Sequence, residues 1–587
     1  MGQTGPCQAV YGPGAPVRGA RFRACECCGL HALPPGGSAG LTAPGPACLR
    51  RPHHASFVPY NPGFRFSEGI GALSLFRSLS TVGLFTLSSR ILGFIRDLVL
   101  AHIFGANAMT DAFFVAFKIP NFLRRLFAEG AFATAFVPVL TEYKTRRERS
   151  ELRDFIDHVA GSLGLVLLVV SAIGVVAAPL IVGLFAFGWV VGEQQAKLEL
   201  ATQMLRLTFP YLFFISLTAF AGGVMNAWNR FAVPAFTPVL LNLSLIACAL
   251  WLSPHMQEPV VALAWGVLLA GITQFVFQLP FLGKLDLMPR PRPRFSDPGV
   301  RRILRLMVPA LFAVSVTQIN LLLDTVLAST LATGSISWLY YSDRLMEFPQ
   351  GVLGVALGTV LLPKLSREQA AESPGEFNRT LDWGLRMALI FGLPAAVGLA
   401  VLAGPMISTL FQSDVFTSHD VLMARRSLVA YSLGLLAFIL IKVLAPAYYA
   451  RQDTRTPVRI GVIAMATNMV LNLALIFPLQ HAGLALATSV AAYINAYLLW
   501  RGLHRAGIYR PAAGWWRLFL QVTGACAVMA VVLLLGAGAI DSWFGQGHMQ
   551  RALRLAVWIC AGVASYFTVL YAAGLRPAML RRSARRS

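Results

Sequence analysis

Long apolar stretches alternate with short polar breaks from residue 73 to the end of the chain. A helix needs about 20 apolar residues to cross a bilayer, and fourteen of these stretches come near or exceed that length. Their apolar residues run continuously rather than in alternation, so the pattern predicts spanning helices and excludes a transmembrane β-barrel. Only 13% of the 587 residues are charged, against roughly 25% in a soluble domain. We therefore exclude a soluble globular enzyme.

The predicted fold is an all-α polytopic membrane protein with fourteen transmembrane helices. The expected spans cover residues 75–102, 111–140, 156–186, 201–226, 233–253, 260–282, 306–329, 336–362, 387–411, 421–449, 458–477, 483–500, 518–540 and 552–574.

Lysine and arginine gather in the connections that follow even-numbered spans, such as 144–153, 284–305 and 501–517. The connections after odd-numbered spans, such as 103–110, 254–260, 330–336 and 541–550, contain only Lys197. Because basic loops stay in the cytoplasm, we expect both termini to be cytoplasmic in a multi-pass protein of the cell inner membrane. The net charge of +23 is then explained by basic loops that face anionic membrane lipids. We expect no nucleic acid as a partner.

The first fifty residues are rich in glycine and proline and have no periodic apolar segment. Such a composition cannot bury a core. We predict that residues 1–72 form a disordered N-terminal extension and that the true start codon lies downstream of Met1.

Two segments resemble each other at an offset of 225, namely 112–140 and 337–365, with Pro138 aligned to Pro363. A second pair, 229–234 and 452–457, has an offset of 223. These offsets predict two six-helix lobes in a pseudo-two-fold arrangement, an N-lobe at 73–285 and a C-lobe at 306–505. Residues 286–305 would form a cytoplasmic linker, and 506–587 two further helices with a basic tail. Parallel repeats of this kind build transporters that rock around a site between the repeats; a duplicated scaffold without transport is the alternative.

Ionisable side chains inside the spans are the main functional signal, because each costs about 2.5–3.5 kcal/mol on insertion scales and normally faces a polar cavity or a partner. The cations are Arg90, Arg96, Lys118, Arg124, Arg125, Arg206, Arg344 and Lys442. The acids are fewer: Asp97, Asp111, Glu129, Asp324, Asp343 and Glu347.

Helical spacing suggests how these charges pair. We expect Asp97 to hold Arg90 and Glu129 to hold Arg125, which leaves Arg96 and Arg124 the least neutralised. Guanidinium groups grip phosphate oxygens bidentately. The excess of arginine therefore predicts a water-filled cavity that receives a phosphate or pyrophosphate. The alternative is purely structural pairing of the cations with acids.

A second polar cluster is expected in the C-lobe. Asp324, Asn468, Asn472 and Thr488 would offer the oxygen ligands that a hard cation such as sodium prefers. Hydrogen bonding between helices is the alternative explanation, because Asn and Thr serve it routinely.

Three segments, 89–97 (SRILGFIRD), 110–132 and 337–359, resemble the MurJ (MviN) family of lipid II flippases. This family belongs to the same superfamily as the multidrug (MATE-like) and polysaccharide exporters, and the resemblance extends from about Leu73 to the C-terminus. It implies a transporter rather than an enzyme. Its substrate would be lipid II, the undecaprenyl-pyrophosphate-linked precursor, moved between leaflets for peptidoglycan and cell wall biogenesis, and hence cell shape.

The resemblance also implies site residues. The family's cavity arginines fall on Arg90, Arg96, Arg124 and Arg344. Its other sensitive positions fall on Ser89, Asp111, Arg125, Glu129, Ser337 and Asp343. The last two helices would guide the lipid tail, and cell-wall synthesis or division proteins would be partners.

The sodium site of some family members resembles the cluster of Asp324, Asn468, Asn472 and Thr488. Asn472 replaces an acid of those members, so both sodium and the membrane potential stay open as the coupling force. We expect no cofactor otherwise.

Two rival functions differ from this one. A flippase for another polyprenyl-linked saccharide would share the cationic cavity. A membrane glycosyltransferase would need an acid-bearing site on a substantial outward loop, and the outward loops are mostly too short for one.

Overall fold

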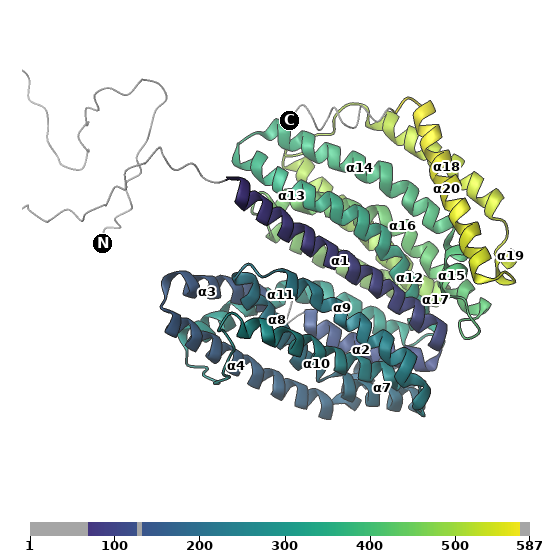
Figure 1. The fold of residues 1–587 in the computed structure, drawn as a ribbon. Coiled ribbons are helices and arrows are strands. Elements are labelled where there is room, and N and C mark those ends of the chain that lie inside the picture. Colours follow the sequence, from purple (N-terminus) through teal and green to yellow (C-terminus); the bar gives the residue numbers. More distant parts are fainter. Residues whose placement is uncertain (1–67, 126–131, 576–587) are drawn as a thin grey trace, which may run out of the picture. The chain divides into compact units, whose positions relative to one another are not determined.

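The computed structural model describes residues 68–125 and 132–575 (Figure 1). Within these ranges the chain is helical and contains no β-strand, which confirms the predicted all-α class. The first half comprises α1 Glu68–Phe104, α2 Ala108–Arg124, α3 Ala133–Arg146, α4 Arg149–Val176, α5 Ala178–Phe185, α6 Phe187–Val191, α7 Gln195–Thr208, α8 Tyr211–Ala227, α9 Ala232–Ala247, the short turns η3 Cys248–Leu252 and η4 Ser253–His255, and α10 Val261–Gly283.

The second half continues with α11 Pro298–Ala328, α12 Ser335–Pro349, η5 Gln350–Gly354, α13 Val355–Ala370, α14 Pro374–Val401, α15 Ala403–Phe411, α16 Ser418–Tyr449, α17 Arg455–Arg505, α18 Trp515–Ala537, α19 Asp541–Phe544 and α20 His548–Ala572. Residues 68–72, which we assigned to the extension, are helical because α1 begins at Glu68.

Ten helical segments of the described chain are long and apolar enough to cross a membrane. One of them, α17, joins two predicted spans, and its backbone is non-helical only at Gln480, where φ is 52°. The predicted span at 111–140 is divided instead between α2 and α3. The number of fourteen therefore stays a prediction, while a polytopic helical membrane protein is confirmed.

The internal repeat is visible in the backbone. Pro138 lies inside α3 and its counterpart Pro363 lies inside α13. Asn229 and Gln452, the first residues of the second repeated pair, both adopt left-handed backbone angles, with φ of 58° and 60°. Left-handed φ is uncommon outside glycine. Finding it at both aligned turns supports a common origin for the two halves.

The connection between α10 and α11 is bound to α4. The backbone N–H of Arg290 donates to Asp157 Oδ1 at 2.7 Å, and that of Arg294 donates to Ser162 Oγ at 3.0 Å. A Cβ on Gly161 would lie 2.4 Å from the backbone of Arg292, so only glycine permits this approach. Residues 298–305, which we assigned to the linker, are already the first turns of α11.

Helix α11 contacts both halves of the protein. Near its start, Val300 and Ile303 pack in one core with Phe155 and Ile156 of α4. Near its end, Asp324 accepts a hydrogen bond from Asn472 of α17. Figure 1 shows α8, α9 and α10 side by side in the first half, and α18 beside α20 at the C-terminal end.

Candidate functional site

A cavity of about 190 Å³ lies where α2, α11, α12, α16 and α17 meet. It is therefore built from both repeats, as the parallel duplication predicts. Six basic or acidic side chains line it: Lys118, Arg125, Asp324, Asp343, Arg344 and Glu347. Asp343 and Glu347 are one helical turn apart on α12, which explains why both face the cavity.

Arg96 of α1 is buried in a polar network beside this cavity. Its Nε and one terminal nitrogen donate to Asp97 Oδ1 at 3.0 and 2.7 Å, and the other terminal nitrogen donates to Asn242 at 3.1 Å. Tyr340 of α12 also donates its hydroxyl to Asp97 Oδ1, at 2.9 Å. Because α1 and α12 belong to different lobes, this network joins the lobes.

The predicted pairing of Asp97 with Arg90 is wrong, since Asp97 pairs with Arg96. Adjacent side chains diverge on a helix, but the guanidinium is long enough to reach back to its neighbour's carboxylate. Arg96 is consequently neutralised, contrary to our expectation that it would be among the least neutralised cations. Sequence reasoning also missed Tyr340 and Asn242, because spacing along one helix says nothing about side chains that arrive from others.

Arg344 lines the cavity itself, as Arg125 does. One of its terminal nitrogens pairs with Glu347 at 2.6 Å, and its Nε lies 3.7 Å from Asp97 Oδ2. The guanidinium carbon lies 4.9 Å from the ring centroid of Tyr340, a cation–π distance. Its partner Glu347 is exposed, with 47% of its side chain accessible, so this pair is open to exchange with another anion.

The other predicted arginines lie in different surroundings. Arg124 donates to Asn121 Oδ1 of its own helix at 2.8 and 3.0 Å. Arg90 is exposed and approaches Gly351 of η5, where an added Cβ would lie 2.4 Å from its terminal nitrogen. The carbonyl of Ser89 accepts a hydrogen bond from Asn242. Glu129 lies outside the described residues.

Asp111 forms a contact between the lobes rather than a wall of the cavity. Its Oδ2 accepts the backbone N–H of Gly334 at 2.7 Å. Its Oδ1 accepts the Ser337 hydroxyl at 2.7 Å and the Ser337 N–H at 3.0 Å. Asp111 is only 2% exposed. We call Asp111, Gly334 and Ser337 the interlobe contact.

Two further hydrogen bonds accompany the interlobe contact. The ammonium of Lys197 donates to Thr333 Oγ1 at 2.7 Å, and the N–H of Gly188 donates to Ser329 Oγ at 3.0 Å. All these residues lie at the ends of helices opposite to the basic loops. The two lobes are therefore joined at the face that carries few positive charges.

The second predicted cluster is assembled into one chain of hydrogen bonds. The amide of Asn472 donates to Asp324 at 2.7 Å and to Asn468 at 2.9 Å, and the Asn468 amide donates to Thr488 at 3.1 Å. Within residues 68–125 and 132–575, the buried Asn472 Oδ1 has no hydrogen-bond partner. That orphaned oxygen, beside a carboxylate and a hydroxyl, is compatible with a hard cation.

A separate apolar groove of about 480 Å³ runs along α12, α14, α15, α18 and α20. Its walls include Phe94, Phe348, Pro394, Leu533 and Val563. The groove thus connects the two C-terminal helices with α1 and α12, which carry the charged network.

Comparisons with known proteins agree with this geometry. Residues 100–553 match the family model described as lipid II flippase MurJ. A Vibrio cholerae protein named "Probable lipid II flippase MurJ" is 50% identical over 86% of this chain and 97% of its own length. A Burkholderia cenocepacia protein named "Lipid II flippase MurJ" is 44% identical over 87% of this chain and its full length.

Solved structures give the same result. A structure titled as lipid II flippase MurJ in an inward closed conformation superposes with a TM-score of 0.71 at 28% identity, covering 83% of this chain and 97% of its own. An inward-facing MATE-family multidrug transporter superposes with a TM-score of 0.58 at 14% identity, covering 72% and 95%, and shows the shared fold. The chain is a multi-pass membrane protein of the inner membrane, and it belongs to the MurJ family of lipid II flippases.

Proposed function

We propose that this protein moves lipid II from the inner to the outer leaflet of the cytoplasmic membrane by alternating access, for cell wall biosynthesis. The observation that carries the proposal is the charged cavity between the repeats, with Arg344, Lys118 and Arg125 on its wall. A pyrophosphate is a doubly charged anion with oxygens spaced for bidentate guanidinium bonds. Family membership supports lipid II as its carrier.

The Arg344 guanidinium is the centre of the proposed anion clamp. It is held by the face of Tyr340 and shared between Glu347 and Asp97. An arriving pyrophosphate would exchange with the exposed Glu347 carboxylate, while Asp97 and Tyr340 keep the guanidinium in place. Arg96, which is paired with Asp97, would support the clamp only through its bond to Tyr340, and Arg124 is the third arginine of the clamp predicted from the sequence.

Alternating access fits the way the lobes are joined. The interlobe contact closes one face, and the basic loops lie at the other. By the positive-inside rule the basic face is cytoplasmic, so both termini are cytoplasmic and the described conformation is closed to the outside. The polyprenyl tail would occupy the apolar groove beside α18 and α20 while the headgroup enters the cavity.

The energy source is proposed to be either a sodium ion or the membrane potential. The residues that would hold sodium are Asp324, Asn468, Asn472 and Thr488, which are joined by one chain of hydrogen bonds. The membrane potential would instead act on the net charge of the clamp as it crosses the bilayer, worth about 2.3 kcal/mol per charge per 100 mV. Cell-wall synthesis and division proteins are proposed as partners.

The test uses proteoliposomes with fluorescent lipid II in one leaflet. We expect Arg344→Gln to translocate lipid II at least about tenfold more slowly, because a charge-assisted bond contributes roughly 1.5–3 kcal/mol. Arg206→Gln is the matched control, since Arg206 is exposed on α7. Equal rates for Arg344→Gln and wild type would refute the clamp. Competition by another polyprenyl-linked saccharide, with no competition by unlabelled lipid II, would favour the rival substrate.

A further inference from the structure

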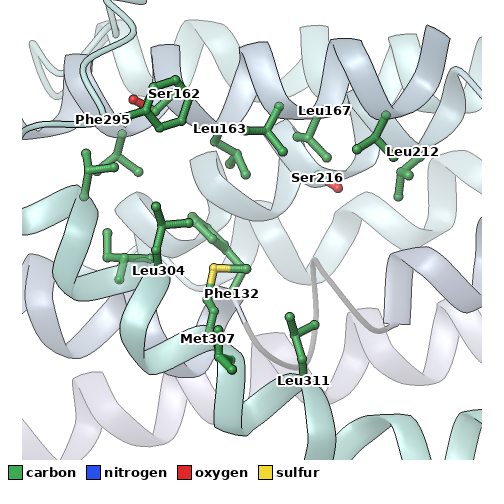
Figure 2. A pocket seen from close by; sticks show the side chains of 16 residues that line it. Phe132, Ser162, Leu163, Leu167, Leu212, Ser216, Phe295, Leu304, Met307 and Leu311 are labelled. Carbon is green, nitrogen blue, oxygen red and sulfur yellow. The ribbon is translucent and has the colours of Figure 1, made fainter. Parts of the chain in front are cut away.

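The strongest unassigned feature is a second cavity, of about 260 Å³, between α4, α8 and the first half of α11 (Figure 2). Apolar side chains dominate its wall, among them Phe132, Leu163 and Met307. Figure 2 shows Leu163 and Leu167 of α4 facing Leu304 and Met307 of α11 across the hollow. None of the site residues described above lines this cavity.

The cavity opens toward the surroundings of the protein. Four of its lining residues are well exposed: Val166 and Phe295 at 43%, Leu304 at 45% and Val308 at 56%. Val166 lies in the middle of α4, a helix long and apolar enough to cross a membrane, so an apolar side chain exposed there faces lipid. The hollow is therefore accessible to a hydrocarbon chain from the bilayer.

The cavity has a basic rim at one end. Phe295 and Leu304, which line it there, are the sequence neighbours of Arg294 and Arg305. The Nε of Arg301 donates to the backbone carbonyl of Phe295 at 3.3 Å, which fixes a guanidinium at the rim. We call Arg294, Arg301 and Arg305 the basic rim.

The neighbouring acids are already engaged. Asp297 caps the start of α11 through the N–H groups of Gly299 and Val300 and lies 3.1 Å from His158. Glu142 pairs with Arg302 at 2.8 Å. Among the residues that the structure describes, no carboxylate lies within 4.0 Å of the Arg301 or Arg305 guanidinium. The rim therefore keeps a positive charge that an anion can complement.

We propose that this cavity binds an anionic phospholipid, with its phosphate on the basic rim and one acyl chain between α4, α8 and α11. Basic pockets between spanning helices select acidic lipid headgroups, and an apolar slot beneath them orders the chain. The site is distinct from the groove beside α18 and α20 and from the charged cavity. Its bound chain would fill the space between the start of α11 and the helices of the N-lobe.

The first experiment locates the lipid on the wild-type, full-length protein. Vesicles containing phosphatidylglycerol with a photoreactive group near the end of one acyl chain are irradiated, and the modified residues are mapped by mass spectrometry. We expect modification at Val166 or Val308, away from the basic rim. Modification confined to other lipid-facing residues, such as Leu180 of α5 at 77% exposure, would overturn the proposal.

The second experiment measures selectivity by native mass spectrometry after delipidation and addition of phosphatidylglycerol or phosphatidylcholine. We expect Arg301→Gln with Arg305→Gln to weaken phosphatidylglycerol binding roughly 25-fold, at about fivefold for each arginine near a membrane surface. Arg147→Gln with Arg149→Gln, which removes the same charge from the neighbouring basic loop, is the control. Equal binding of the two lipids by wild type, or equal losses in both double variants, would overturn the proposal.

A third variant tests the apolar slot without changing the charge. Val308→Trp places a bulky ring at the mouth of the cavity, and Leu180→Trp places the same ring on an exposed surface elsewhere. We expect only Val308→Trp to reduce phosphatidylglycerol binding and photolabelling. Unchanged binding and labelling in a folded Val308→Trp protein, judged by a monodisperse elution profile, would exclude occupancy of the slot.

Discussion

The carboxylate of Asp111 on α2 accepts both the hydroxyl and the backbone N–H of Ser337 on α12, so one buried side chain joins the two lobes. Asp111→Asn removes the charge and one acceptor position. Charge-assisted hydrogen bonds contribute roughly 1.5–3 kcal/mol each, so the closed face should open more often. The measurement is the distance between spin labels at Glu193 and Ser418 in a cysteine-free background. We expect a longer, broader distribution.

The matched control for that change is Asp541→Asn, because Asp541 is exposed at the same face. It should leave the label distances as they are in wild type. If Asp111→Asn does the same, Asp111 does not hold the lobes together.

Tyr340→Phe should destabilise the protein while leaving the aromatic face beneath Arg344. The lost hydroxyl donates to Asp97 and accepts from Arg96, and both partners are buried. An unsatisfied buried group costs about 1–3 kcal/mol. A lower midpoint of thermal unfolding in detergent is the expected result. The control is Tyr571→Phe, because Tyr571 is 66% exposed. Equal midpoints for the two variants would contradict a stabilising role for the hydrogen bonds among Arg96, Asp97 and Tyr340.

Gly434→Ala should also destabilise, through packing. An added Cβ would lie 2.8 Å from the backbone Cα of Ser489 on α17, which cannot move aside alone. Overpacking of this kind costs about 1–3 kcal/mol. Gly524→Ala on α18 is the control, because its Cβ would meet nothing within 4 Å. The measurement is the midpoint of thermal unfolding of both variants. Equal midpoints for Gly434→Ala and Gly524→Ala would show that α16 and α17 can move apart without loss of stability.

Asn472→Asp should create or strengthen a dependence on sodium. The Asn472 amide now donates to Asp324, and an aspartate there would place two carboxylates side by side. Like charges at such a distance need a cation or a proton. We expect sodium, but not choline, to raise the thermal stability of this variant. Identical thermal stability in sodium and choline salts would show that the residue at position 472 does not determine whether sodium binds.

Much of the fold could be predicted from sequence because apolar length and basic loops are local signals. The repeat could be predicted for the same reason, and the two left-handed turns at Asn229 and Gln452 agree with it. The break at Gln480 was predictable as well, because it falls in the gap between the expected spans 458–477 and 483–500, two residues after Pro478. The division of the expected span 111–140 between α2 and α3 was not predicted.

The site was predicted in part. Lys118, Arg125, Asp343 and Arg344 were found because charge inside an apolar run is itself a signal, and they line one cavity. Asp97 was assigned to the wrong arginine because the choice depends on Asn242 and Tyr340, which come from other helices. Asp111 was grouped with the cavity charges, although its partners are a backbone N–H and a serine more than 220 residues away.

Helix α11 packs in the core of the first half at Val300 and accepts a hydrogen bond from α17 at Asp324. The loop that precedes it is hydrogen-bonded to α4. Because α11 is attached at both ends, it cannot shift as a whole when the two halves move relative to each other. The helix must bend instead, and the bend is expected near Pro309, because proline removes a backbone hydrogen bond of the helix there.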